Sequence, residues 1–241
     1  MIPYGTFTFF LIAFIVLLPV IIMGLVGKRS RIYNGISTMV MIVLIFSSEK
    51  HNLFGLSFLS VQLINFILYI LWQVAIIMFY WKSRAKNNTF SKFFVVIVLS
   101  ILPLVVVKVM QSSWFGATQL KLHENKVIEF IGFLGISYVT FKSVQLLMEI
   151  RDGSIKEVKV SKVFQFISFF PTISSGPIDR YKRFVKDEAK IPSSDQYQEL
   201  LHKAIHYIML GFLYKYIIAY LIQVYAINPL LLDFNSFTTK W

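Results

Sequence analysis

Long apolar runs alternate with short basic clusters along most of the chain. Residues 1–27 carry no charge, and the first run ends at a cluster over 28–31. A helix rises about 1.5 Å per residue, so roughly 20 apolar residues cross a hydrocarbon core of about 30 Å. We predict six membrane-spanning helices, over residues 5–26, 32–48, 62–81, 92–108, 128–149 and 205–226. The predicted fold class is therefore all-α, a polytopic transmembrane helical bundle forming a single membrane domain over 1–241.

The apolar pattern breaks around residues 165–178 and then turns basic. The sequence FFPTISSGPIDRYKRF occupies residues 169–184, with Pro171, Gly176 and Pro177 inside it. Proline lacks a backbone donor and glycine permits positive φ, so this stretch cannot be regular helix throughout. Irregular backbone at membrane depth is tolerated only where protein or a watered cavity shields it. We predict a re-entrant segment here, in which hydroxyl side chains satisfy the freed backbone groups.

Several polar side chains fall within the predicted spans. Gln62, Asn65 and Gln73 indicate hydrogen bonds between helices rather than ligands for a substrate. Lys142 lies deep in the span over 128–149, which makes it a possible intramembrane polar site. The alternative is that its long stem carries the ammonium to a polar bundle interior or to the near surface.

Composition agrees with the membrane class and excludes others. Of 241 residues, 56% are hydrophobic, and the mean hydropathy is +0.67. The net charge of +12 is spread in clusters between apolar runs, which favours topology signals over nucleic-acid binding. The sequence has no cysteine, which excludes disulfides, thiolate catalysis and zinc–thiolate sites.

The basic clusters predict the orientation of a multi-pass protein in the cell membrane. If the spans alternate, loops on one side hold 15 basic residues and loops on the other hold 4. The positive-inside rule makes the richer side cytoplasmic and leaves the N-terminus outside. On the cytoplasmic side we expect Lys182, Arg183 and Lys186 to meet membrane lipids, with Tyr181 and Phe184 as anchors among the headgroups.

Three groups of residues are candidates for chemistry. His202 and His206 have the i, i+4 spacing of metal ligands, but no third ligand follows, so interfacial histidines are the favoured interpretation and no metal is predicted. The serines at 174 and 175 lie outside any nucleophile elbow and have no visible base. Asp179 and Arg180 could orient each other or hold a phosphate, or form an ordinary interfacial ion pair.

The run over 169–184, together with GISYVTFKSVQLLMEIRDG over 135–153, resembles the membrane-bound O-acyltransferase family, in its D-alanyl transfer branch. The resemblance implies a tunnel through the membrane. It also implies that D-alanine passes from a thioester on a cytoplasmic carrier protein toward lipoteichoic acid, by way of an extracytoplasmic transfer partner. No cofactor is expected to bind directly, because the carrier protein supplies the phosphopantetheine arm.

By this resemblance, the motif residues line or brace the cytoplasmic approach to the tunnel. They are Pro171, Ser174, Ser175, Gly176, Pro177, Asp179, Arg180 and Tyr181. None of them is the family's catalytic group, which is a histidine in a later apolar segment.

None of the four histidines in this sequence, at 51, 123, 202 and 206, matches the family's histidine motifs. A histidine base would be needed to activate an acceptor. We therefore expect an N-terminal portion of such an enzyme that is inactive alone, with no catalytic residue of its own. The alternatives are a non-catalytic scaffold that docks the carrier protein, and a small-solute transporter.

Overall fold

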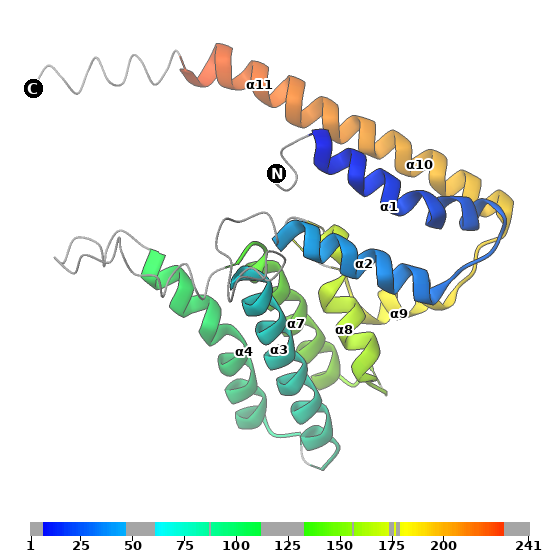
Figure 1. Ribbon diagram of the computed structural model, residues 1–241. Coiled ribbons are helices and arrows are strands. Elements are labelled where there is room, and N and C mark those ends of the chain that lie inside the picture. The colour runs from blue at the N-terminus through cyan, green and yellow to red at the C-terminus, as the bar shows by residue number, and fades with distance from the viewer. Residues whose placement is uncertain are drawn as a thin grey trace, which may run out of the picture. The chain divides into compact units, whose positions relative to one another are not determined.

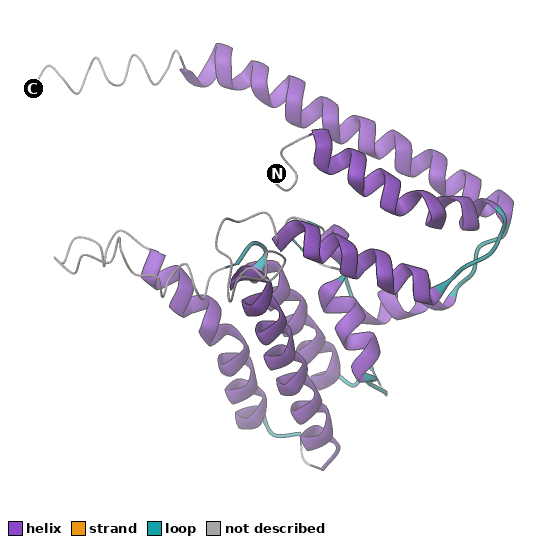
Figure 2. Cartoon of the chain, in the orientation of Figure 1, coloured by secondary structure: helices purple, strands orange, loops and turns teal. Residues whose placement is uncertain are grey.

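The computed structural model describes residues 7–46, 61–86, 88–111, 133–155, 157–173, 176 and 179–228. Every regular element within these residues is helical (Figures 1 and 2). The longer helices in the first two thirds of the chain are α1 (Phe7–Leu25), α2 (Arg31–Phe46), α3 (Val61–Lys86), α4 (Phe90–Gln111) and α7 (Ile136–Arg151). Two short helices follow, α8 (Val160–Ser168) and α9 (Tyr181–Ala189), with the 3₁₀ turn η2 (Phe170–Thr172) after α8.

Among the described residues, four helices are long and apolar enough to cross a membrane, which confirms the all-α, polytopic fold class. They cover Phe7–Leu25, Val61–Ala85, Phe90–Val109 and Ser194–Ile227, and Ile32–Phe46 is a shorter apolar helix. Of the span predicted over 128–149, the structure describes residues from 133 onward, and α7 begins at Ile136. The six individual crossings stay a prediction.

The chain divides into two compact units. The first comprises residues 1–20 and 30–190, and the second comprises residues 21–29 and 191–241. In the first unit, α3, α4 and α7 pack against one another, and α8 packs on α3 and α7 (Figure 1). Aromatic side chains fill one end of this core, where Phe133 meets Phe66 and Tyr69 edge to face at 5.5 and 5.4 Å between ring centroids.

Buried polar side chains link the helices of the first unit. Gln73 of α3 donates to the carbonyl oxygen of Ser100 in α4 (2.9 Å) and accepts from its hydroxyl (2.7 Å). This confirms the prediction that Gln73 hydrogen bonds between helices. The hydroxyls of Tyr69 and Thr140 lie 2.6 Å apart and join α3 to α7. Asn65 is also buried, and its Nδ2 has no hydrogen-bond partner among the described residues.

The second unit is built on one long helix that begins at Ser194. It runs as α10 (Ser194–Phe212), the π-helical turn η3 (Leu213–Ile218), α11 (Ala219–Ile222) and a second π turn, η4 (Gln223–Ile227). Ser193 caps it by accepting from the amide of Gln196 (3.4 Å). At its start, Ser194 donates to the carbonyl of Leu25 (2.6 Å). No residue from Ser194 to Ile227 is buried.

Candidate functional site

The proline-containing stretch breaks the helix as the sequence predicts. α8 ends at Ser168, Phe169 leaves the helical conformation with ψ near 105°, and Pro171 lies in the first turn of η2. Hydroxyls satisfy two carbonyls here, since Ser168 donates to Phe164 (2.6 Å) and Thr172 donates to Phe169 (3.1 Å). The described part of the stretch is thus an irregular, internally bonded turn. Its re-entry into the membrane stays a prediction.

Gly176 serves this turn through its small size rather than through a positive φ. Glycine permits a positive φ, but Gly176 does not use one. A Cβ at Gly176 would instead lie 2.5 Å from Thr172 Cα, closer than any side chain tolerates. The position therefore needs glycine because two backbone segments approach each other closely, and hydrophobic pattern alone cannot distinguish this from a need for positive φ.

Lys142 of α7 contacts this turn. Its side chain is buried, with 2% of its surface exposed. The ammonium donates to the carbonyl oxygen of Phe166 (3.3 Å) and to Thr172 Oγ1, and lies 5.5 Å from the centroid of the Phe166 ring. We call the contact among Lys142, Phe166 and Thr172 the Lys142 junction. The ammonium thus lies among polar groups in the protein interior, as in the second interpretation that the sequence left open.

Two further contacts join α7 to the segment after α8. Gly135, with φ of +89°, lies against Ile173 so closely that a Cβ would be 2.2 Å from the Ile173 carbonyl oxygen. At the other end of α7, Glu149 accepts from the amide of Lys182 (3.3 Å). The two sequence stretches that carry the family resemblance, 135–153 and 169–184, therefore pack against each other in space. Sequence reasoning missed Gly135 as a contact residue, although it opens the first motif.

Asp179 and Arg180 do not form the ion pair that their adjacency suggests. Asp179 Oδ1 accepts from the backbone amide of Arg180 (2.7 Å) and pairs with Nε of Arg183, one helical turn later (2.8 Å). The side chain of Arg180 is exposed. The carboxylate of Asp179 also attracts the ammonium of Lys142 electrostatically. The direct contacts of Asp179 are thus with the backbone before α9 and with the first turn of α9.

Tyr181 and Phe184 are not headgroup anchors, which corrects the sequence prediction. Tyr181 is buried, and its ring meets Phe166 edge to face at 5.5 Å. Phe184 is half-buried and packs on Phe166 and Phe169 at 5.4 and 5.6 Å. Burial raises the pKa of the Tyr181 phenol, so it stays neutral at physiological pH. The apolar face of α9 is covered by α8, while Lys182, Arg183 and Lys186 are exposed.

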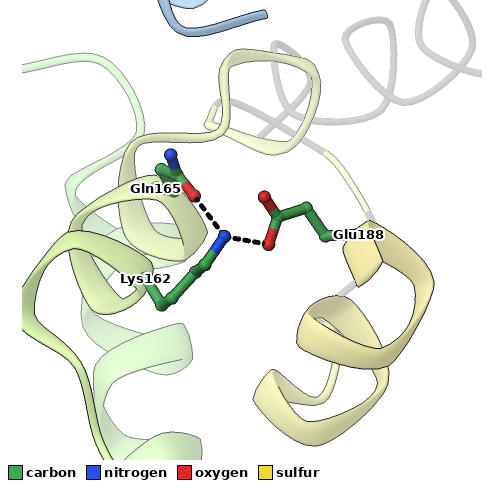
Figure 3. Close-up of polar contacts among 3 residues, drawn as sticks. All are labelled: Lys162, Gln165 and Glu188. Atoms are coloured by element: carbon green, nitrogen blue, oxygen red, sulfur yellow. Dashed lines mark hydrogen bonds and ion pairs between the residues drawn. The ribbon is translucent and has the colours of Figure 1, made fainter. Parts of the chain in front are cut away.

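An ion pair reinforces the packing of α9 on α8 (Figure 3). The ammonium of Lys162 contacts Glu188 and lies 3.4 Å from Oε1 of Gln165. Both charged side chains are largely covered, with 24% and 12% of their surfaces exposed. This contact, the aromatic cluster around Phe166 and the Lys142 junction together fix both sides of the helix break.

The structure brings together five of the eight predicted motif residues. Pro171, Gly176, Asp179, Arg180 and Tyr181 lie in or beside the turn between α8 and α9. Ser174, Ser175 and Pro177 lie outside the described residues, so their predicted role stays a prediction.

The described residues at this site offer an interior cation, hydroxyls and closely packed backbone. No group of three or more histidine, cysteine, aspartate or glutamate residues in the described part of the chain could hold a metal ion. His202 and His206 are exposed on α10 and take no part in the Lys142 junction. The contacts of the Lys142 junction hold backbone segments together.

No protein-family model matches the chain. Three relatives do, each named teichoic acid D-alanyltransferase. The chain is 45% identical over 231 residues to the protein of Bacillus subtilis (strain 168), covering 95% of this chain and 55% of the relative. It is 42% identical over 222 residues to that of Lacticaseibacillus rhamnosus (91% and 50%). It is 35% identical over 228 residues to that of Streptococcus thermophilus (95% and 50%).

The chain thus spans about half the length of the relatives it matches, while the match covers nearly all of its own residues. Matches over more than 220 of the 241 residues include both the helix break and the α7 stretch that contacts it. The chain is accordingly a homologue of the teichoic acid D-alanyltransferases over about half of their length, in agreement with the D-alanyl transfer resemblance carried by its two motifs.

Proposed function

We propose that this chain is a membrane component of D-alanyl transfer to teichoic acid. The observation that carries the proposal is the shared sequence with the D-alanyltransferases over nearly the whole chain. The packing of the two motif stretches supports it, because residues 135–153 and 169–184 form one structural unit. In this proposal, D-alanine arrives as a thioester on the phosphopantetheine arm of a cytoplasmic carrier protein and leaves toward lipoteichoic acid through an extracytoplasmic partner.

The proposed location is the cell membrane, with several crossings and the N-terminus outside. Four helices of sufficient length and hydropathy support an integral membrane protein. The excess of basic residues in alternate loops supports the orientation. With this orientation, the turn between α8 and α9 opens to the cytoplasm, where the carrier protein would approach.

We further propose that the chain needs the other half of the relatives' sequence for the chemical step. Acyl transfer to a hydroxyl requires a base near neutral pKa, for which histidine is the usual choice. The two histidines in the described residues lie exposed on α10 and not at the Lys142 junction. In this proposal the described site guides the acyl group, and the base comes from the part of the relatives' sequence that lies outside the match with this chain.

Complementation in Bacillus subtilis tests this function. In cells lacking their teichoic acid D-alanyltransferase, we would express this chain alone, or a chimera in which it replaces the matching part of that enzyme. Alkali-released D-alanine from teichoic acid measures transfer. The chimera should restore esterification, and the chain alone should not.

Two outcomes would contradict the proposal. A chimera that reaches the membrane in normal amounts yet restores no D-alanine would exclude a shared transfer function. Full restoration by the chain alone would exclude its dependence on a second half. Membrane content, measured with an epitope tag, separates loss of function from loss of the protein.

A further inference from the structure

The buried ammonium of Lys142, a residue of α7, lies at the C-terminal end of the neighbouring helix α8. α8 ends at Ser168, so Phe166 belongs to the last turn, where carbonyl groups lack the amide partners of a helix interior. The C-terminal end of a helix also carries partial negative charge. Lys142, in α7, donates to the Phe166 carbonyl and thereby supplies the hydrogen-bond partner that the helix break removes.

The same ammonium reaches across the break to η2. It bonds Thr172 Oγ1, and this hydroxyl also donates to the carbonyl of Phe169. Thr172 in turn lies against Gly176 with no room for a Cβ. Lys142 therefore joins residues before the break to residues within it, and does so from a neighbouring helix.

A buried ammonium is costly unless hydrogen bonds and charge compensate it. Here the compensation comes from the carbonyl of Phe166, the hydroxyl of Thr172, the face of the Phe166 ring and the carboxylate of Asp179. All four groups belong to α8, to the turn or to the start of α9. The lysine is thus stabilised only when these segments hold their present positions around α7.

We propose that Lys142 is a positioning residue that fixes the shape of the break between α8 and α9. Through Thr172 it holds the turn against α7, and without it the turn separates from α7 while the rest of the first unit keeps its fold. Resting on the proposed function, this also means that Lys142 affects acyl transfer through the shape of the turn and does not contact the reacting atoms.

The absence of cysteine from the chain allows a direct test by labelling of a single introduced cysteine. Ser168→Cys places a thiol at the end of α8, where the serine is 1% exposed. Ser37→Cys places a second reporter in α2, where the serine is 4% exposed and bonds only within its own helix. The rate of reaction with a membrane-permeant maleimide, measured on the chain in native membranes, reports the opening of each site.

We expect Lys142→Met to raise the labelling rate at position 168 at least tenfold and to leave the rate at position 37 unchanged. Lys162→Met is the matched control, because it removes a largely covered lysine that belongs to α8 and pairs with Glu188 but makes no contact with η2 among the interactions described above, and it should change the rate at 168 by less than about threefold. Thr172→Val should mimic Lys142→Met, whereas Thr172→Ser, which keeps the hydroxyl, should label as the parent does. The double variant of Lys142→Met and Thr172→Val should react no faster than the faster single variant.

Four results would overturn the proposal. The first is an unchanged labelling rate at position 168 in Lys142→Met, and the second is an equal increase at position 37, which would show general unfolding. The third is an increase at position 168 in Lys162→Met as large as that in Lys142→Met. The fourth is a double variant of Lys142→Met and Thr172→Val whose increase is the product of the two single increases. Labelling does not depend on acyl transfer. A chimera without transfer activity but with the expected labelling would therefore refute the proposed function and leave the positioning role of Lys142 intact.

Discussion

At the scale of single residues, close backbone contacts decide the packing of the two motifs. Gly135 combines a left-handed φ of +89° with a Cβ position 2.2 Å from the Ile173 carbonyl oxygen. The left-handed φ and the close approach of Ile173 each disfavour a side chain, and both do so through the Cβ atom that glycine lacks. Gly135 therefore couples the start of α7 to the turn after α8.

Gly135→Ala should destabilise the chain. The left-handed backbone costs about 1–3 kcal/mol for a residue with a Cβ, and the clash with Ile173 adds to it. The change is measured as the lowered midpoint of unfolding when SDS is titrated into the protein in mild detergent.

Gly35→Ala is the matched control. Gly35 lies within α2 with nothing within 4 Å of its Cβ position. Alanine in a helix interior is favoured over glycine by roughly 0.5–1 kcal/mol, so this variant should be at least as stable as the parent. If Gly135→Ala matched Gly35→Ala in stability, the contact with Ile173 would not matter to the fold.

At the scale of helices, paired polar side chains fix which faces of α3 and α4 meet. Gln73 and Ser100 exchange two hydrogen bonds in a core where both are fully buried. Apolar contacts alone would tolerate a shift in the register of the two helices, whereas the hydrogen bonds between Gln73 and Ser100 form in one register only.

A double-mutant cycle on Gln73→Leu and Ser100→Ala should show coupling. Hydrogen bonds between membrane helices contribute about 0.6 kcal/mol on average, so we expect a coupling free energy of that size in SDS unfolding. Ser37→Ala with Gln73→Leu is the control pair, since the Ser37 hydroxyl bonds Asn34 in its own helix. Additive effects in the first pair would show that the α3–α4 contact does not depend on these bonds.

At the scale of the whole molecule, the charge distribution predicts sidedness. Ala85→Cys, exposed near the end of α3, should react with a membrane-impermeant maleimide only after cells are permeabilised. Ser113→Cys, in a stretch outside the described residues, should react in intact cells. The opposite pattern would invert the predicted orientation and would put the turn between α8 and α9 on the wrong side for a cytoplasmic carrier protein.

The amino-acid sequence alone determined the fold class, the position of the helix break and the family. Apolar runs of about 20 residues leave few alternatives to membrane helices, because only internally bonded backbone is stable in lipid. The break at residues 169–171 follows from proline, which cannot donate a backbone hydrogen bond. Gln73 was also identified correctly, since a buried amide within an apolar helix requires a partner.

Only the tertiary structure decided what the break contacts. Which helix faces Thr172, Ile173 and Tyr181 depends on the packing of segments that are not adjacent in the sequence, and hydrophobic pattern does not encode such pairings. The close approach of Gly176 to Thr172 was therefore not foreseen, and Tyr181 was assigned to the lipid headgroups although it packs on Phe166. Lys142 shows the difference most directly: sequence identified a charge inside a helix, and structure supplied the carbonyl, hydroxyl and carboxylate that make its burial stable.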